Sequence, residues 1–142
     1  MLKIKSYPHF FYPLLLLALI SGLTSGLLLI PTMLEFKLDT PVDWRLSGSL
    51  QVPVLFTHAL AGWVLSLLVG ALWQTHMRNN WRRARHRLSG TINALTLVLL
   101  GATALGLYYA GSSELQVATA LLHTGLGILL ILTFSVHALF RR

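Results

Sequence analysis

The sequence predicts an all-α integral membrane protein: one four-helix bundle, built from two helical hairpins, over residues 1–142. Only 11% of the residues are charged and the mean hydropathy is +0.70, whereas about 25% of the residues in a soluble domain carry charge. Four apolar runs are each long enough to cross a hydrocarbon core of ~30 Å as a helix. Because little chain remains outside these runs, we expect no separate soluble domain.

The first apolar run extends from Phe10 to Ile30 and reads FFYPLLLLALISGLTSGLLLI. Lys3 and Lys5 precede it, as basic residues precede the apolar stretch of a secretory signal. The run is longer than such a stretch, and its small residues, SGLTSG, lie inside it rather than after it. We therefore expect a retained membrane helix over residues 10–30.

Three further helices are expected over residues 52–74, 88–110 and 115–140, with an outer loop between the first two helices. The two halves of the chain resemble each other, since LISGLTSGLLLI in the first helix has a counterpart in LLGATALGLYYA in the third. His58 and His123 each begin an H-x-x-x-G pattern in the second and fourth helices. The similarity predicts two hairpins related by an approximate two-fold axis, with small residues that allow close helix contacts.

The charges predict the orientation of the bundle. Nine of the eleven cationic residues lie at the N-terminus, in the link between the second and third helices, or at the C-terminus. An even number of helices places these three segments on one side, and the positive-inside rule makes that side cytoplasmic. We expect no nucleic-acid partner, because basic runs beside membrane helices are routine. The four acidic residues all fall on the opposite side: Glu35, Asp39, Asp43 and Glu114.

The chain contains no cysteine. This composition excludes disulfides, thiolate metal sites, iron–sulfur clusters and the covalent attachment of c-type haem. The polar residues that could bind a metal within the helices are therefore histidines. Ionisable residues inside a membrane are costly and are candidates for function, although a single membrane histidine can also serve only as a hydrogen-bonding residue between helices.

His58 and His123 are predicted to lie at the same depth. His123 precedes the centre of its helix by five residues and His58 precedes the centre of its own by six, which correspond to ~8 Å and ~9 Å. Two neutral imidazoles that face each other at one depth are suited to ligate a haem iron from both sides.

His137 follows His123 by fourteen residues, so both rings share one helix face at an axial separation of ~21 Å. Two haems stacked across a membrane would need about this spacing. The partner of His137 stays open between His9, His76 and His86, in that order of preference. His76 ranks below His9 because it lies eighteen residues after His58, a span of ~27 Å that exceeds the ~21 Å of the fourth helix.

This pattern resembles the four-helix, two-haem b-type membrane cytochromes of bacteria, which include bacterial cytochrome b561 and the membrane subunit of formate dehydrogenase. In that family the fourth helix carries two histidines with thirteen residues between them, as His123 and His137 do here. The resemblance implies that His58, His123, His137 and His9 bind haem b. The chain also resembles a doubled form of short, cytochrome b-like two-helix domains, with DWRLSG before its second helix. A single haem stays an alternative, because Leu72 stands fourteen residues after His58, where a second histidine would be expected.

The resemblance implies a b-type cytochrome in the bacterial inner membrane that transfers electrons between a periplasmic redox protein and a quinone or another acceptor. The periplasmic partner would be a multihaem cytochrome or an iron–sulfur subunit. The chain would then be an electron-transfer subunit of an oxidoreductase complex rather than a stand-alone enzyme. Two alternatives from other classes are a haem-free membrane anchor or assembly subunit and a transporter that relays protons through histidines.

Overall fold

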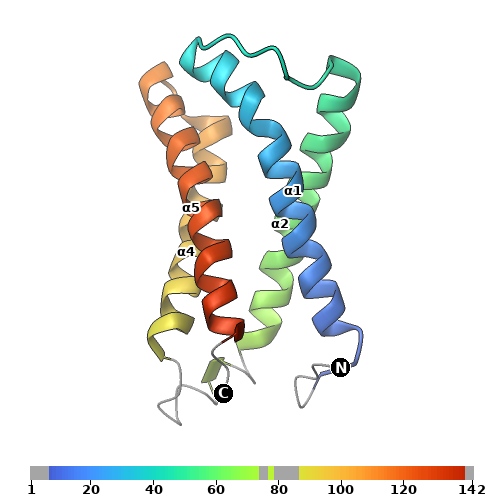
Figure 1. Ribbon diagram of the computed structural model, residues 1–142. Coiled ribbons are helices and arrows are strands. Elements are labelled where there is room, and N and C mark those ends of the chain that lie inside the picture. The colour runs from blue at the N-terminus through green and yellow to red at the C-terminus, as the bar shows by residue number, and fades with distance from the viewer. Residues whose placement is uncertain (1–6, 74–76, 79–86, 140–142) are drawn as a thin grey trace.

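The structure, a computed structural model, describes residues 7–73, 77–78 and 87–139. Four α-helices make up most of these residues, which include no strand. The helices lie lengthwise beside one another, and the start of α1 and the end of α5 are at the same end of the bundle (Figure 1). Their bounds are Phe11–Leu38 for α1, Gly48–Leu72 for α2, Arg87–Tyr109 for α4 and Ser113–Leu139 for α5.

The surface of the bundle identifies the chain as a multi-pass membrane protein. All four helices are long and apolar enough to cross a bilayer. Their outward side chains are large and apolar: Trp63 is 72% exposed, Leu67 68% and Val98 69%. In water such a surface would be unfavourable, whereas in a bilayer the lipid chains cover it. The described residues thus confirm the prediction of a helical protein with four helices long and apolar enough to cross a membrane.

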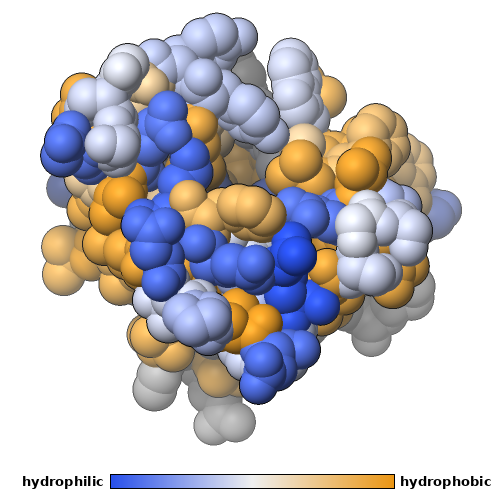
Figure 2. All heavy atoms as spheres, turned by 90° about the horizontal axis from the view of Figure 1, so that it is seen from above, coloured by the Kyte–Doolittle hydropathy of each residue, from blue (hydrophilic) through white to orange (hydrophobic). Residues whose placement is uncertain are grey.

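Polar side chains gather at the end of the bundle where residues 39–47 join α1 to α2. Figure 2 shows this end, with hydrophilic residues across its middle and hydrophobic residues at its flanks. Arg45 forms an ion pair with Glu35 at 2.6 Å, and Lys37 donates a hydrogen bond to Gln116. The second contact ties the last turn of α1 to the first turn of α5.

Helix α1 extends to Leu38, beyond the end predicted at Ile30. The prediction ended the helix there because the continuous apolar run ends at Ile30. Pro31 instead lies inside α1, and the helix ends where Asp39 adopts a left-handed conformation with φ 49°. The polar contacts of Glu35 and Lys37 stabilise the additional turns. Helix α2 also begins early, at Gly48, because the carbonyl of Ser47 accepts hydrogen bonds from two amides of the first turn.

The helices pack as a chain of neighbours rather than as a closed ring. Helix α1 contacts both α2 and α5, α4 contacts α5, and α2 and α4 are scarcely in contact. An apolar cluster joins α1 to α2 near the start of α1, and Phe134 of α5 packs against it. The two hairpins therefore meet mainly through α1 and α5. The cluster consists of Phe11, Leu15, Ala18, Leu65 and Leu68.

The close approach of α4 and α5 depends on Gly106. A Cβ atom built at Gly106 would lie 2.6 Å from Cγ2 of Thr119, a distance that requires the helices to shift. We expect Gly106→Ala to lower the free energy of unfolding by about 1–3 kcal/mol, the usual cost of overpacking. Thr119→Ser removes Cγ2 but keeps the hydroxyl that donates to the Leu115 carbonyl at 2.8 Å, so it should restore stability in the double variant.

Thermal unfolding in detergent measures this effect. Gly101→Ala is the matched control, because a Cβ atom at Gly101 meets nothing within 4 Å. If Gly106→Ala were as stable as Gly101→Ala, the inference that α4 and α5 are in close contact at Gly106 would be contradicted.

Candidate functional site

His58 of α2 and His123 of α5 face each other between the two hairpins. Their ring centroids are 6.0 Å apart and the ring planes cross at 74°. Both side chains are partly buried, although most of the neighbouring surface of the two helices is open to lipid. The structure thus brings together the two histidines that the sequence predicts at one depth.

Helix α1 fixes the ring of His58 through its Nδ1 atom. Nδ1 lies 3.0 Å from the carbonyl oxygen of Gly22 and 3.1 Å from Oγ of Ser25. A carbonyl can only accept a hydrogen bond, so Nδ1 must carry the hydrogen. In the neutral ring Nε2 then keeps its lone pair, which is the form of histidine that binds a metal.

Helix α4 fixes the ring of His123 in the same way. Nδ1 of His123 lies 3.0 Å from Oγ1 of Thr103. The single hydroxyl hydrogen of Thr103 is donated to the carbonyl of Leu99 at 2.8 Å, so its oxygen accepts from the imidazole. Each histidine is therefore held by the other helix of its own hairpin, with Nε2 left as the atom that can ligate.

His137 is held by a hydroxyl of α4 as well. Its Nδ1 atom lies 2.8 Å from Oγ of Ser89. Ser89 and Thr103 are fourteen residues apart, the same spacing as His137 and His123 on the antiparallel helix α5. The sequence interpretation missed both hydroxyl residues, although this repeated spacing was a signal that could have found them.

The predicted partner of His137 is not brought to it. His9 lies in a turn before α1 with an exposed side chain, and the ring contacts of the described residues include no pair of His9 with His137. His76 and His86 lie outside the described residues. The inner pair of histidines therefore stays a prediction.

The donor set at His58 and His123 suits a metal that brings its own equatorial ligands. Within the described residues, no group of three or more His, Cys, Asp or Glu side chains could hold a bare metal ion. A structural zinc takes four protein ligands, whereas a haem iron needs only axial ones. Two neutral imidazoles 6.0 Å apart could therefore hold a haem, which needs no further protein ligand.

Glycines beside the two rings leave room for a flat group. Gly62 and Gly127 follow His58 and His123 by one helical turn, and a Cβ atom at either would meet nothing within 4 Å. Gly26 has a different role, because its missing Cβ would lie 3.0 Å from Cε1 of His58. The glycine at this position is what allows the ring to approach α1.

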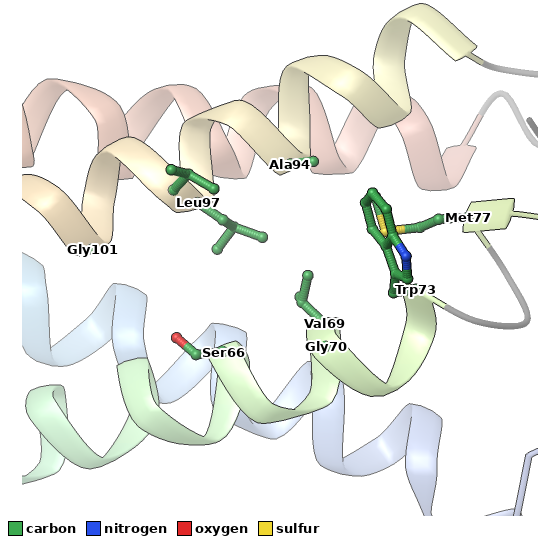
Figure 3. A pocket seen from close by; sticks show the side chains of 9 residues that line it. Ser66, Val69, Gly70, Trp73, Met77, Ala94, Leu97 and Gly101 are labelled. Atoms are coloured by element: carbon green, nitrogen blue, oxygen red, sulfur yellow. The ribbon is translucent and has the colours of Figure 1, made fainter.

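A groove of about 540 Å³ separates α2 from α4 on the side of the histidine pair where α1 begins. Its walls are mainly apolar, with small residues such as Gly70 and Gly101 on facing helices, and Trp73 and Met77 lie at one end (Figure 3). The volume lies within the usual range of small-molecule sites, about 300–1,000 Å³. The groove shows that the two hairpins are not packed tightly together on this side.

The comparisons with protein-family models, curated proteins and solved structures found no match to this chain. No relative therefore supplies a function or a ligand. The proposal that follows depends on the two facing imidazoles, the groups that hold their Nδ1 atoms, and the membrane-spanning helices that carry them.

Proposed function

We propose that the chain is a b-type membrane cytochrome, in which His58 and His123 would hold an outer haem. The observation that carries this proposal is the pair of imidazoles with centroids 6.0 Å apart. The Nδ1 atoms of both rings are engaged by Gly22 and Thr103, so Nε2 would be the ligating atom. A pair of neutral imidazoles without further protein ligands suits haem better than a bare ion.

When bound, the haem supplies the redox chemistry, since its iron takes up and releases one electron. The residues of the chain would bind and orient the haem and exclude water from it. His58 and His123 donate their Nε2 lone pairs, and the groups on their Nδ1 atoms fix the tautomer and the ring orientation. The apolar helices keep water away and lower the local dielectric constant, which tunes the reduction potential. We infer electron transfer rather than conversion of a substrate.

An inner haem would be bound by His137 with His9 as its second ligand. Two observations support this part of the proposal. Nδ1 of His137 lies 2.8 Å from Oγ of Ser89, and Nδ1 of His123 lies 3.0 Å from Oγ1 of Thr103. The start of α1 also lies at the same end of the bundle as the end of α5 (Figure 1). A protein with the outer haem alone is the alternative if His9 does not reach the iron.

The orientation follows from charge, with both termini in the cytoplasm of a bacterium and the 39–47 segment in the periplasm. We propose that this segment docks a periplasmic redox protein, a multihaem cytochrome or an iron–sulfur subunit, and that a quinone or another acceptor takes the electrons. The parallel contacts of His58 to α1 and of His123 to α4 support two hairpins with approximate two-fold symmetry.

An absorption spectrum of the purified, dithionite-reduced protein tests the proposal. We expect the sharp α-band of a b-type haem, and a pyridine haemochrome assay should count two haems per chain, or one. Because the imidazole planes cross at 74°, the oxidised protein should give a highly anisotropic low-spin EPR signal. A protein that expresses, folds and shows no haem when haem supply is sufficient would contradict the proposal and favour an anchor or a proton relay.

A further inference from the structure

We propose that Thr103 is a positioning residue that sets the reduction potential of the outer haem through His123, and that Ser89 acts in the same way on His137. This inference rests on the proposed function, because it concerns the ligands of the same haems. Neither residue would touch a haem iron. Each acts on the imidazole from the side opposite the ligating nitrogen.

The contacts between α4 and α5 follow one antiparallel register. Ser89 bonds His137 at 2.8 Å, Asn93 bonds Thr133 at 2.7 Å, and Thr103 bonds His123 at 3.0 Å. From one contact to the next, the number of residues advanced along α4 equals the number of residues moved back along α5. The two histidines therefore meet their hydroxyl partners through the same packing of α4 on α5.

The direction of the hydrogen bond gives Thr103 its effect. Its hydroxyl hydrogen is donated within α4 to Leu99 at 2.8 Å, so the oxygen accepts from Nδ1 of His123. An acceptor at Nδ1 makes Nε2 a more basic ligand. A more basic ligand stabilises ferric iron more than ferrous iron, so Thr103 should lower the reduction potential.

Both rings have a hydroxyl partner and a main-chain partner. The carbonyl of Gly22 lies 3.0 Å and the hydroxyl of Ser25 3.1 Å from Nδ1 of His58. His123 has the hydroxyl of Thr103 at 3.0 Å and also a hydrogen bond with the Leu100 carbonyl. A substitution at Thr103 therefore removes the hydroxyl acceptor of His123 and leaves the carbonyl in place.

A redox titration of the purified holoprotein tests the inference with Thr103→Val, which keeps the shape of the side chain but removes the acceptor. We expect the reduction potential of the outer haem to become more positive by about 59 mV. For one electron this shift corresponds to a tenfold lower ratio of ferric to ferrous iron at a given potential. Thr103→Ser should return the potential to that of the unmodified protein. Ser89→Ala should shift the potential of the inner haem only.

Thr96→Val is the matched control. Thr96 lies on the same helix, is 3% exposed and donates to the carbonyl of Ile92 at 2.8 Å, and none of its described hydrogen bonds reaches a histidine. The inference is overturned if Thr103→Val shifts the potential no more than Thr96→Val does. If Thr103→Val does not fold, Thr103→Ala must give the same positive shift of the reduction potential. An unchanged potential in Thr103→Ala would also overturn the inference. Absence of haem from the unmodified protein would instead refute the proposed function.

Discussion

Replacing either His58 or His123 by alanine is expected to remove the outer haem. Each ring would supply one nitrogen to the iron, so either substitution would leave this haem with only the opposite ring of the pair as a ligand. Loss of a group that only orients a metal ligand costs about 10–100-fold in affinity, so loss of the ligand itself should cost more. The haem content per chain, from the pyridine haemochrome assay, should fall by half if two haems are present and to zero if there is one.

Thr57→Ala serves as the control for these variants. Thr57 is the neighbour of His58 on α2, and its exposed hydroxyl donates to the carbonyl of Pro53 at 2.9 Å. This substitution should leave the haem content unchanged. His137→Ala should remove only the inner haem. Retention of the full haem content by both the His58 and the His123 variants would show that the ligand assignment is wrong.

A leucine at Gly26 is expected to have a similar effect without replacing either ligand. A Cβ atom at Gly26 would lie 3.0 Å from Cε1 and 3.4 Å from Nδ1 of His58. A side chain there would displace the ring, strain its hydrogen bond to the Gly22 carbonyl and disturb its pairing with His123. We therefore expect Gly26→Leu to lose the outer haem while the helical circular dichroism signal is retained. The haem content of Gly26→Ala should lie between that of Gly26→Leu and that of the unmodified protein.

Gly22→Ala is the matched control for Gly26→Ala, one turn away on the same helix. A Cβ atom at Gly22 would meet Ala61 at 3.7 Å and Leu65 at 3.9 Å, both ordinary van der Waals distances. Its haem content should equal that of the unmodified protein. Equal haem content in Gly26→Leu would mean that α1 does not confine the ring of His58 in the holoprotein.

The main architecture could be predicted because it depends on local properties of the chain. Length and apolarity identify each membrane helix, and counting residues from helix centres placed His58 and His123 at one depth. The end of α1 could not be predicted in this way. Pro31 normally interrupts a helix, and contacts with residues distant in the sequence, such as the ion pair of Glu35 with Arg45 and the hydrogen bond of Lys37 to α5, help to stabilise the turns beyond it.

The groups that hold the histidines were not predicted either. Ser25, Ser89 and Thr103 belong to different helices from the rings that they contact. Their roles depend on how neighbouring helices are rotated and shifted against each other, and hydropathy carries no information about such a register. A serine or threonine in an apolar helix commonly bonds to the carbonyl four residues earlier, so its presence alone does not indicate a second partner.

Helix α1 determines how firmly the separation of the two imidazoles is maintained. Its 28 residues span ~42 Å, more than the ~30 Å of a hydrocarbon core, and it crosses the bundle obliquely (Figure 1). It lies against α2 at one end and is tied to α5 at the other, whereas α2 and α4 scarcely touch. Because α1 is the helix that contacts both α2 and α5, a bend in α1 would change the separation of the two hairpins and, with it, the distance between His58 and His123.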